Sequence, residues 1–273
     1  MNKVHKIKSD KKSNQFYIVA GDWHSFHLDE SAYKALIATA KSISKKNGKS
    51  KVHLVINGDF LDVPYLMKKD EGFQFWKTKS VGIESFFIPM LDEECDWGNI
   101  ILDELQKIFK TITLVGGNHC EARIRYFRES KHCPKAYKHY FDLEARLKLK
   151  ERNIKLIKYN DFLQLGKNLF ITHGMFHGST CHKKHYEAVS SSIIFSHIHN
   201  HGVKAFSCLG ETKHSISLPA MCKLDPEYLK GNTTNWSVGF GLVVLRPDNM
   251  FHFTCHQLWN DKLILPGGEE FEF

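Results

Sequence analysis

The chain has 273 residues, a length that fits one α/β domain with an inserted part better than two full domains. Its apolar fraction of 42% and charged fraction of 25% are those of a globular protein, and no apolar run approaches the roughly 18 residues of a membrane helix. The formal charge of +8 favours a polyanionic partner, nucleic acid first, although lysine runs near a terminus are usually solvated surface.

The lysines concentrate in residues 3–12 and 41–51, the two candidate stretches for such a contact. No apolar segment follows the first charged residues, so we expect no secretory signal, no membrane partner and a cytoplasmic location. The seven cysteines are scattered without a C-x-x-C pair, which predicts reduced thiols rather than a disulfide framework or a zinc knuckle. None of this indicates an oligomeric state.

Three apolar runs in the first half are predicted strands, and each ends in a polar motif. They cover residues 16–20, 52–56 and 112–115. Helical periodicity is found over 29–46 and again around Ile101, Leu105 and Ile108. Strands that alternate with helices imply a parallel sheet, in which ligands bind at the carboxyl ends of the strands.

The second half is predicted to be mostly β. A helix is expected over about 136–149. Six short strands are expected after it, at 154–158, 168–172, 193–195, 215–218, 238–245 and 251–256. The whole pattern predicts one α/β domain over 1–273, with two mixed β-sheets packed face to face and helices outside. The aromatic-rich stretch 63–98 is predicted to be an insertion that either walls the substrate cleft or forms a satellite hydrophobic cluster.

Five short motifs each follow a predicted strand and carry groups that bind metals. They are Gly-Asp-Trp-His (21–24), Gly-Asp-Phe-Leu-Asp (58–62), Gly-Asn-His-Cys-Glu (117–121), Thr-His-Gly (172–174) and Ser-His-Ile-His (196–199). Oxygen and imidazole ligands suit manganese, iron, zinc or nickel, and an open catalytic site fits them better than a closed structural zinc site. Asp22 and His24, two apart on an extended chain, would point to the same side, as would His197 and His199.

Any one of these motifs is more often a turn or a capped strand end than a ligand. In this order, however, they resemble the motifs of the calcineurin-like metallophosphoesterase superfamily over roughly residues 16–200. The chain is most similar to small phage-type members and to the double-strand-break repair exonuclease branch, and residues 236–245 resemble the strand that closes the second sheet in such members. This resemblance implies a four-layer αββα sandwich and two divalent metal ions, with manganese favoured and iron, zinc or nickel as alternatives.

The resemblance also implies a role for each motif residue. Asp22, His24 and His199 would bind one ion, Asn118, His173 and His197 the other, and Asp59 would bridge them. A hydroxide held by both ions would attack phosphorus, and His119 would protonate the leaving oxygen while Asp62 orients its imidazole. Arg123 and Arg125 would contact substrate phosphate or lie on the surface, and the pattern has no place for His177, His182, His185 or His201.

Three functions fit this reading of the sequence. The first is a two-metal phosphoesterase that hydrolyses phosphodiester bonds, above all of nucleic acid, as a nuclease or exonuclease does. The alternative is a phosphomonoesterase acting on nucleotides or phosphoproteins, although Val63 and Pro64 follow Asp62 where phosphoprotein phosphatases have Arg-Gly. A non-catalytic scaffold is disfavoured because no ligand of the pattern is missing.

Overall fold

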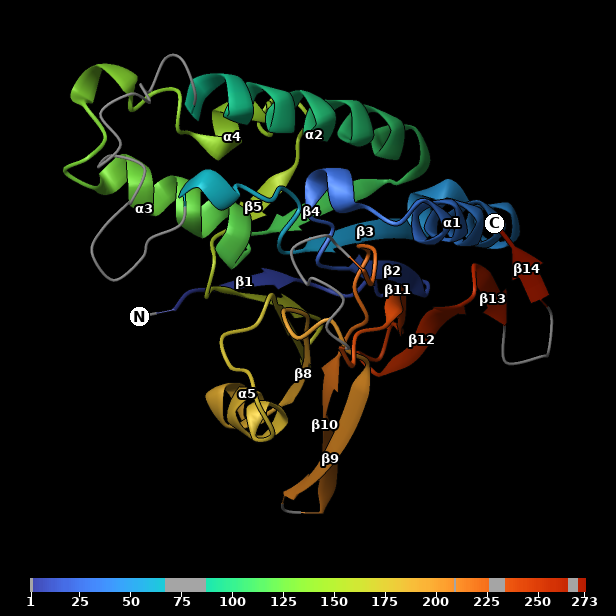
Figure 1. Cartoon of the computed structure of the whole chain (residues 1–273). Coiled ribbons are helices and arrows are strands. Elements are labelled where there is room, and N and C mark those ends of the chain that lie inside the picture. Colours follow the sequence, from blue (N-terminus) through green and yellow to red (C-terminus); the bar gives the residue numbers. More distant parts are fainter. Residues whose placement is uncertain (1, 67–86, 209, 226–233, 265–269) are drawn as a thin grey trace.

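Two β-sheets lie face to face between layers of helices in the computed structural model of this chain (Figure 1). The structure describes residues 2–66, 87–208, 210–225, 234–264 and 270–273. Within these ranges one sheet has eight strands, in the order β14-β13-β12-β11-β2-β3-β4-β5, and the other has six, in the order β1-β6-β7-β8-β10-β9. The predicted fold class, an α/β protein with two mixed sheets packed face to face, is confirmed.

The eight-stranded sheet is parallel on one side and antiparallel on the other. Its parallel strands are β2 (Gln15–Ala20), β3 (Val52–Asn57), β4 (Thr111–Val115) and β5 (Lys155–Ile157). Its antiparallel strands are β11 (Val238–Leu245), β12 (Phe251–Trp259), β13 (Lys262–Ile264) and β14 (Glu270–Glu272). The parallel part contains the three strands predicted for the first half of the chain.

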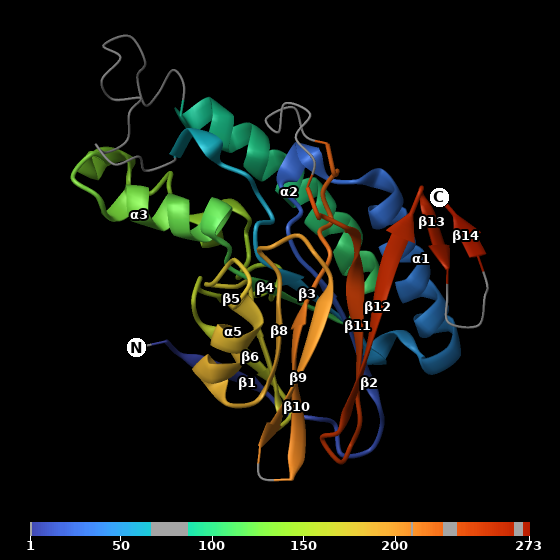
Figure 2. The same ribbon diagram turned by 60° about the horizontal axis from the view of Figure 1, so that its bottom comes forward.

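The six-stranded sheet is mixed throughout. It contains β1 (Val4–Ile7), β6 (Phe162–Leu165), β7 (Leu169–Thr172), β8 (Ser192–Phe195), β9 (Gly202–Cys208) and β10 (Glu211–Ser217). Strands β7, β8 and β10 are parallel neighbours, so β7 and β8 end at the same edge of the sheet. The β9–β10 hairpin extends away from the rest of the molecule (Figure 2).

Alternating side chains of the central strands serve two different cores. Tyr17 and Val19 of β2 face the other sheet, where Leu163 and Ile171 meet them. The intervening side chain Ile18 faces the helices. Because a parallel strand covered on both faces is apolar at nearly every position, the continuous apolar run of β2 is explained by burial on both sides.

Helices cover the outer faces of the two sheets. The helices are α1 (Glu30–Asn47), α2 (Ile88–Ile108), α3 (Arg123–Glu129), α4 (Leu143–Arg146) and α5 (Cys181–Val189). Leu36 of α1 and Leu102 of α2 are fully buried in the core on the outer face of the eight-stranded sheet. The imidazole of His185 in α5 stacks on Phe195 of the six-stranded sheet at 3.9 Å between ring centroids, so α5 lies on the opposite side (Figure 2).

The helix predicted over 136–149 is wrong for most of its length. The chain instead makes a single 3-10 turn at Lys135–Tyr137 and the short helix α4. The carboxylate of Asp142 accepts the N–H of Ala145 and starts a new helix in the middle of the predicted one, while Lys148 takes a positive φ of 51° after its end. A side chain that hydrogen-bonds to the local backbone has therefore overridden the apolar periodicity from which the longer helix was predicted.

Two further expectations need correction. The stretch 236–245 does not close the second sheet, because β11 pairs antiparallel with β2 in the sheet that contains the first-half strands. The expected insertion at 63–98 falls largely on residues 67–86, which lie outside the described residues, while its last part belongs to the regular helix α2. Among the helices that the structure describes, none combines the length and apolar character that crossing a membrane requires.

Candidate metal centre

The five sequence motifs meet where the carboxyl ends of strands from both sheets come together. The eight-stranded sheet contributes the residues after β2, β3 and β4, and the six-stranded sheet those after β7 and β8. Short side-chain distances or a common cluster join all seven predicted ligands to one another. These residues are Asp22, His24, Asp59, Asn118, His173, His197 and His199. The prediction that these motifs converge is therefore confirmed in geometry.

The convergence is achieved by left-handed turns and not by extended chain, which corrects the expectation for the two i, i+2 pairs. Five of the predicted ligands have positive φ: Asp22 (56°), His24 (50°), Asp59 (42°), His197 (71°) and His199 (55°). A residue with a Cβ is uncommon in this region, and each such residue costs on the order of 1–3 kcal/mol. Backbone strain of this kind clusters at functional sites, where surrounding structure holds it in place.

Two glycines make room for the side chains of the site. A Cβ on Gly58, whose φ is +87°, would lie 1.9 Å from Nδ1 of His173. A Cβ on Gly117 would lie 2.0 Å from Oδ1 of Asp59. The close approach of the motif loops to the ligand side chains therefore requires glycine at both positions.

The first group of potential ligands lies around His24 and His199. Their Nε2 atoms are 3.3 Å apart, and Oδ1 of Asp22 is 3.4 Å from Nε2 of His199. The three side chains are nearly inaccessible to solvent, and Nδ1 of His199 has no hydrogen-bond partner within the described parts of the chain. Two imidazole nitrogens and a carboxylate oxygen that face one another in a buried place form a donor set that suits a cation.

The second group lies around the fully buried His173. Its Nδ1 is 3.1 Å from the carbonyl oxygen of Asn57, an acceptor, so Nδ1 carries the hydrogen in the neutral ring. Nε2 then faces Oδ1 of Asn118 at 2.8 Å and Oδ2 of Asp59 at 3.1 Å. A backbone carbonyl that fixes the tautomer of a histidine in this way is the usual support of a metal-ligating imidazole. His197 completes a cluster with Asp59 and His173.

Asp59 belongs to both groups. It forms one cluster with His24 and His119 and another with His173 and His197. Oδ1 also accepts the backbone N–H of His119 at 2.7 Å, which fixes the carboxylate between the two groups. A carboxylate has enough lone pairs to bind two ions at once, so the geometry allows the bridging role that the resemblance implies for Asp59.

In the protein chain alone, the protonation of each ionisable group at the site depends on its charged neighbours. Burial opposes the ionisation of Asp22, yet the neighbouring His199 and His173 hold its pKa below the ordinary value, and burial of Asp59 is likewise outweighed by His173. For His173 burial favours the neutral ring, but the carboxylate of Asp59 raises its pKa to about 9. Burial lowers the pKa of His197 to about 4. The site therefore holds fixed carboxylate charges that a divalent cation can balance.

His119 and Asp62 form a hydrogen-bonded pair beside these groups. Nδ1 of His119 is 2.6 Å from Oδ1 of Asp62, while the imidazole keeps about a third of its surface exposed (31%). Burial of Asp62 opposes its ionisation, but hydrogen bonds from His119 and His24 hold the pKa of the carboxyl below its usual range. The predicted acid and its orienting carboxylate thus lie in the expected relation to each other.

The arginines that follow the third motif differ in their surroundings. Arg123 places NH1 3.4 Å from Oδ1 of Asp62 and is mostly buried, so it lies beside the pair with His119. Arg125 donates to Glu121 at 2.7 Å and lies over the ring of Tyr126, which assigns it a structural role. Only Arg123 remains a candidate for contact with a substrate.

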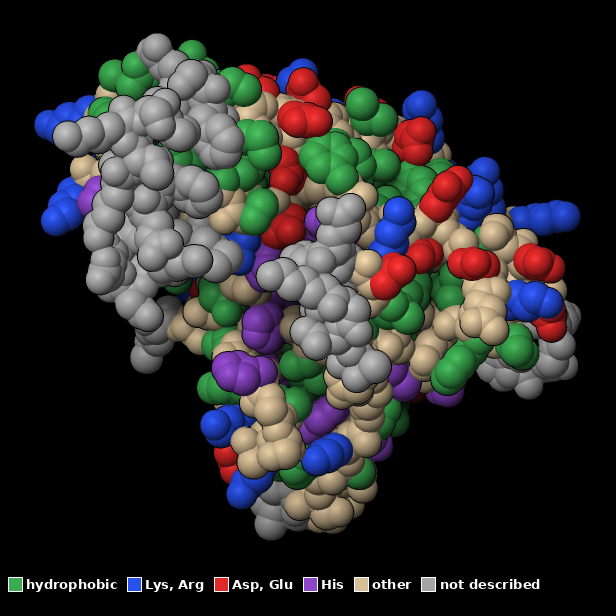
Figure 3. Space-filling view, viewed as in Figure 1, with side chains coloured by type: hydrophobic (Ala, Val, Ile, Leu, Met, Phe, Trp, Pro, Cys, Tyr) green, Lys and Arg blue, Asp and Glu red, His purple; other side chains and the backbone are tan. Residues whose placement is uncertain are grey.

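The histidines left out of the predicted ligand set have local partners. Nδ1 of His182 and Nδ1 of His201 donate to the carbonyls of Ser215 and Ser217, each at 2.9 Å. His185 uses both nitrogens, donating to Cys181 and accepting from Met175. Histidine side chains also gather on the face shown in Figure 3, between the helices and the β9–β10 hairpin.

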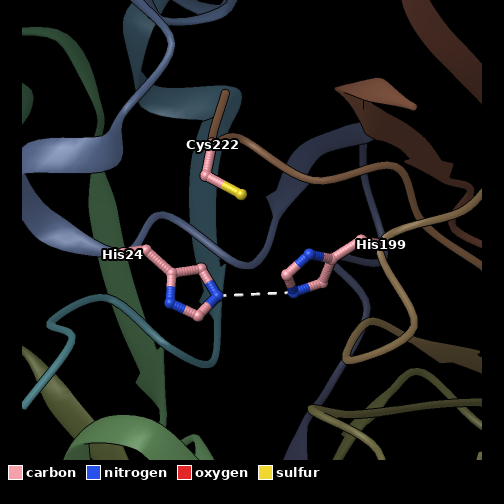
Figure 4. A group of neighbouring side chains, drawn as sticks. All are labelled: His24, His199 and Cys222. Carbon is pink, nitrogen blue, oxygen red and sulfur yellow. Dashed lines mark hydrogen bonds between the residues drawn. The ribbon is translucent and has the colours of Figure 1, made fainter. Parts of the chain in front are cut away.

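Two residues at the site are not recognisable from the sequence motifs. Glu94 of α2 is buried and accepts from the hydroxyl of Ser25 and, at 3.2 Å, from the backbone N–H of Asp62. Cys222 lies against His24 and His199 (Figure 4). A single acidic residue in an amphipathic helix and an isolated cysteine give no local signal, so only the tertiary structure could reveal them.

The two lysine runs lie mostly at the other end of the molecule, but the first begins near the site, where the carbonyl of Lys3 accepts from Phe162 and Asn2 contacts Met175. Lys12 precedes β2 and Lys49–Lys51 precedes β3, so these lysines are near the amino ends of strands whose carboxyl ends form the site. Lys8 and Lys51 line the same surface hollow. The expected contact of these lysines with a polyanion stays a prediction.

The comparisons with known proteins give no further information on this site. No family model matches the chain, and no curated protein matches it. Several solved structures match, and one of them has a TM-score of 0.47 and 9% sequence identity over 89% of this chain and 99% of the other. A likeness this distant carries no argument about function, which must be judged from the residues themselves.

Proposed function

We propose that this chain is a metal-dependent phosphoesterase of the calcineurin-like metallophosphoesterase type, with two divalent ions as cofactors. The observation that supports this most is the double membership of Asp59, which lies in one potential ligand cluster with His24 and His119 and in another with His173 and His197. Asp22 and His199 would complete the first site and Asn118 the second. Two sites that share a carboxylate suit chemistry in which both ions act on one phosphoryl group.

Different residues of the chain serve different steps of the hydrolysis. When bound, a pair of divalent ions supplies positive charge that stabilises the phosphorane-like transition state and makes water a better nucleophile. Asp22, Asp59 and the histidines hold this charge in place, buried from bulk water. Water oxygen bonds to phosphorus, the bond to the leaving oxygen breaks, and that oxygen takes a proton from His119.

The geometry supports His119 as the source of that proton. Because its Nδ1 is engaged with Asp62, Nε2 is the nitrogen that can donate outward, and the ring is partly exposed where a substrate can reach it. Asp62 in turn is fixed by its backbone N–H, which donates to Glu94. Asp62 is thus a positioning residue, and His119 the general acid.

Nucleic acid is the proposed substrate, with hydrolysis of phosphodiester bonds as in a nuclease. The net charge of +8 supports a polyanionic polymer as substrate. The lysine run 41–51 is remote from the site, which favours the alternative, a phosphomonoesterase acting on nucleotides, because a small substrate needs no extended basic surface. Manganese is the proposed ion, with iron, zinc and nickel as alternatives.

The decisive experiment is cleavage of end-labelled single- and double-stranded DNA by the manganese-loaded protein, with a nucleoside monophosphate assayed in parallel. His119→Ala should reduce turnover about 10²- to 10⁴-fold, as loss of a general acid does. His252→Ala changes an exposed histidine of β12 and should leave turnover unchanged. Release of phosphate from the monophosphate with intact DNA would establish the monoesterase instead, and no turnover of either would overturn the proposal.

A further inference from the structure

Cys222 is held against the first group of ligands by the backbone around it. Residues 220–222 cross between the loop after β2 and strand β11, where Ala220 bridges to Gly21 and to Val238. The N–H of Met221 donates to the carbonyl of Gly21 at 3.0 Å, and the carbonyl of Met221 accepts from Asp29 at 2.8 Å. The position of the cysteine is therefore set by paired main chain on both sides.

The thiol faces the imidazoles of His24 and His199. One ligand atom from each of the three residues lies within 4.8 Å of the other two, and the cysteine side chain is directed toward the two rings (Figure 4). Cys222 is almost completely buried, with 1% of its surface exposed. A thiol enclosed with two imidazole nitrogens resembles the mixed sulfur and nitrogen ligand sets that bind zinc.

A second observation is that the described chain itself leaves the imidazole of His199 only partly satisfied. His199 is buried to more than nine-tenths, and its Nδ1 has no hydrogen-bond partner within the described residues. A buried imidazole nitrogen without a partner is costly unless a cation or another group satisfies it. The second group differs, because its cluster is made of Asp59, His173 and His197 and contains no sulfur.

We propose that Cys222 is a thiolate ligand of the ion held by His24 and His199, so that the two metal positions prefer different ions. Thiolate together with imidazole selects zinc for the first position, whereas the second has no sulfur and adds the amide oxygen of Asn118, a donor that suits manganese. On binding, the sulfur lone pair forms the bond to the ion and the thiol proton passes to solvent. This inference rests on the proposed function, since it assigns a residue to one of its two metal positions.

Cobalt(II) titration of the full-length protein tests the inference without relying on activity. The wild type should show a sulfur-to-cobalt charge-transfer band in the near ultraviolet, which Cys222→Ser and Cys222→Ala should lose. Cys133→Ser, a change at another buried cysteine, should keep the band. Zinc affinity should fall at least about tenfold in the Cys222 variants, since even outer-shell changes have effects of this size. X-ray absorption at the zinc edge of the wild type should show a sulfur scatterer, which requires no variant to fold.

The outcomes separate this inference from the proposed function. Cobalt d–d bands and phosphoester turnover without any charge-transfer band or sulfur scatterer would overturn the role of Cys222 and leave the phosphoesterase standing. A charge-transfer band that Cys222→Ser removes, with no turnover on any phosphoester, would support the thiolate ligand and count against the phosphoesterase. Absence of cobalt and zinc binding would overturn both.

Discussion

The Asp62 carboxylate illustrates how one residue of the site acts through another. It lies 2.6 Å from the ring nitrogen of His119 and 3.4 Å from Arg123, but it belongs to none of the potential metal clusters. Asp62→Asn should therefore still bind both ions at saturating concentration and lower kcat by about 10- to 100-fold, the effect of losing an orienting partner. Metal analysis alongside steady-state kinetics checks both parts, and full activity in Asp62→Asn would contradict the positioning role.

Glu94 provides a prediction about pH. Burial raises the pKa of its carboxyl to about 7 from 4.5, against the hydrogen bonds from Ser25 and Asp62 that favour the charged form. A raised pKa means that the folded state binds the proton more tightly, so the contribution to stability is complete below pH 4.5 and is lost as the pH rises to about 7.

The Glu94→Gln variant carries the same acceptor oxygen without the charge. The free energy of unfolding of the ion-depleted wild type, measured relative to this variant, should fall by about 3 kcal/mol between pH 4 and pH 8. Urea unfolding at a series of pH values measures this difference. A constant difference across the range would show that Glu94 has an ordinary pKa in the folded protein.

The sequence could indicate the candidate metal ligands because each of them belongs to a short motif that follows an apolar run. Asp22, Asp59 and Asn118 all follow strands that the pattern of apolar residues predicts correctly. Glu94 and Cys222 could not be found in this way, since their place at the site depends on how α2 and residues 220–222 pack against the loop after β2. Contacts between segments far apart in the chain leave no periodic trace.

At the scale of a loop, Gly58 and Gly48 form a matched pair for experiment. Both have positive φ, 87° and 91°, but a Cβ on Gly58 would collide with His173, whereas one on Gly48 would meet only Ser50 at 3.9 Å. Alanine at either position should cost about 1 kcal/mol from backbone strain. Only Gly58→Ala should also weaken metal binding, because His173 must move.

Calorimetric titration with manganese and zinc measures this difference between the two variants. Equal affinities in Gly58→Ala and Gly48→Ala would mean that the loop after β3 adapts without displacing His173.

Element prediction succeeded where apolar periodicity was undisturbed and failed where local hydrogen bonding intervened. The helix predicted over 29–46 matches α1, whose start is capped by Asp29. The same kind of cap at Asp142 starts the short helix α4 in the middle of the helix predicted over 136–149, and the polar helix α5 with its three buried residues was not predicted at all. Its apolar surface is too small to give a helical pattern, and its histidines are buried through backbone hydrogen bonds.

For the whole molecule, the number and class of the sheets could be predicted, but the distribution of strands between them could not. Strand β11 follows β10 in the chain yet pairs with β2 in the other sheet, and β1 pairs with β6. These choices depend on which apolar faces meet across the core. A pattern of alternating residues shows that a strand has a buried face without showing its partner.

Because the two sheets share the site, ion binding should stabilise the whole fold. A ligand that binds only the folded state adds about 2.7 kcal/mol at a hundredfold excess over its dissociation constant. Manganese should therefore raise the Tm of the wild type, and a chelator should lower it. Asp59→Asn, which loses the residue common to both clusters, should show little of this shift, while the control His252→Ala should retain it.

A scanning calorimetry series with and without the ion measures the effect. An unchanged Tm in the wild type at saturating manganese would argue against a binding site that joins the two sheets.

The left-handed backbone at Asp22, His24, Asp59, His197 and His199 has an evolutionary consequence. Glycine adopts this conformation without steric cost, so replacing any of these residues by glycine relieves strain while it removes a ligand. Selection for thermal endurance and selection for chemistry therefore act in opposite directions at the same five codons. A laboratory lineage propagated for heat resistance alone should accumulate glycine there, and one propagated for turnover should keep the strained side chains.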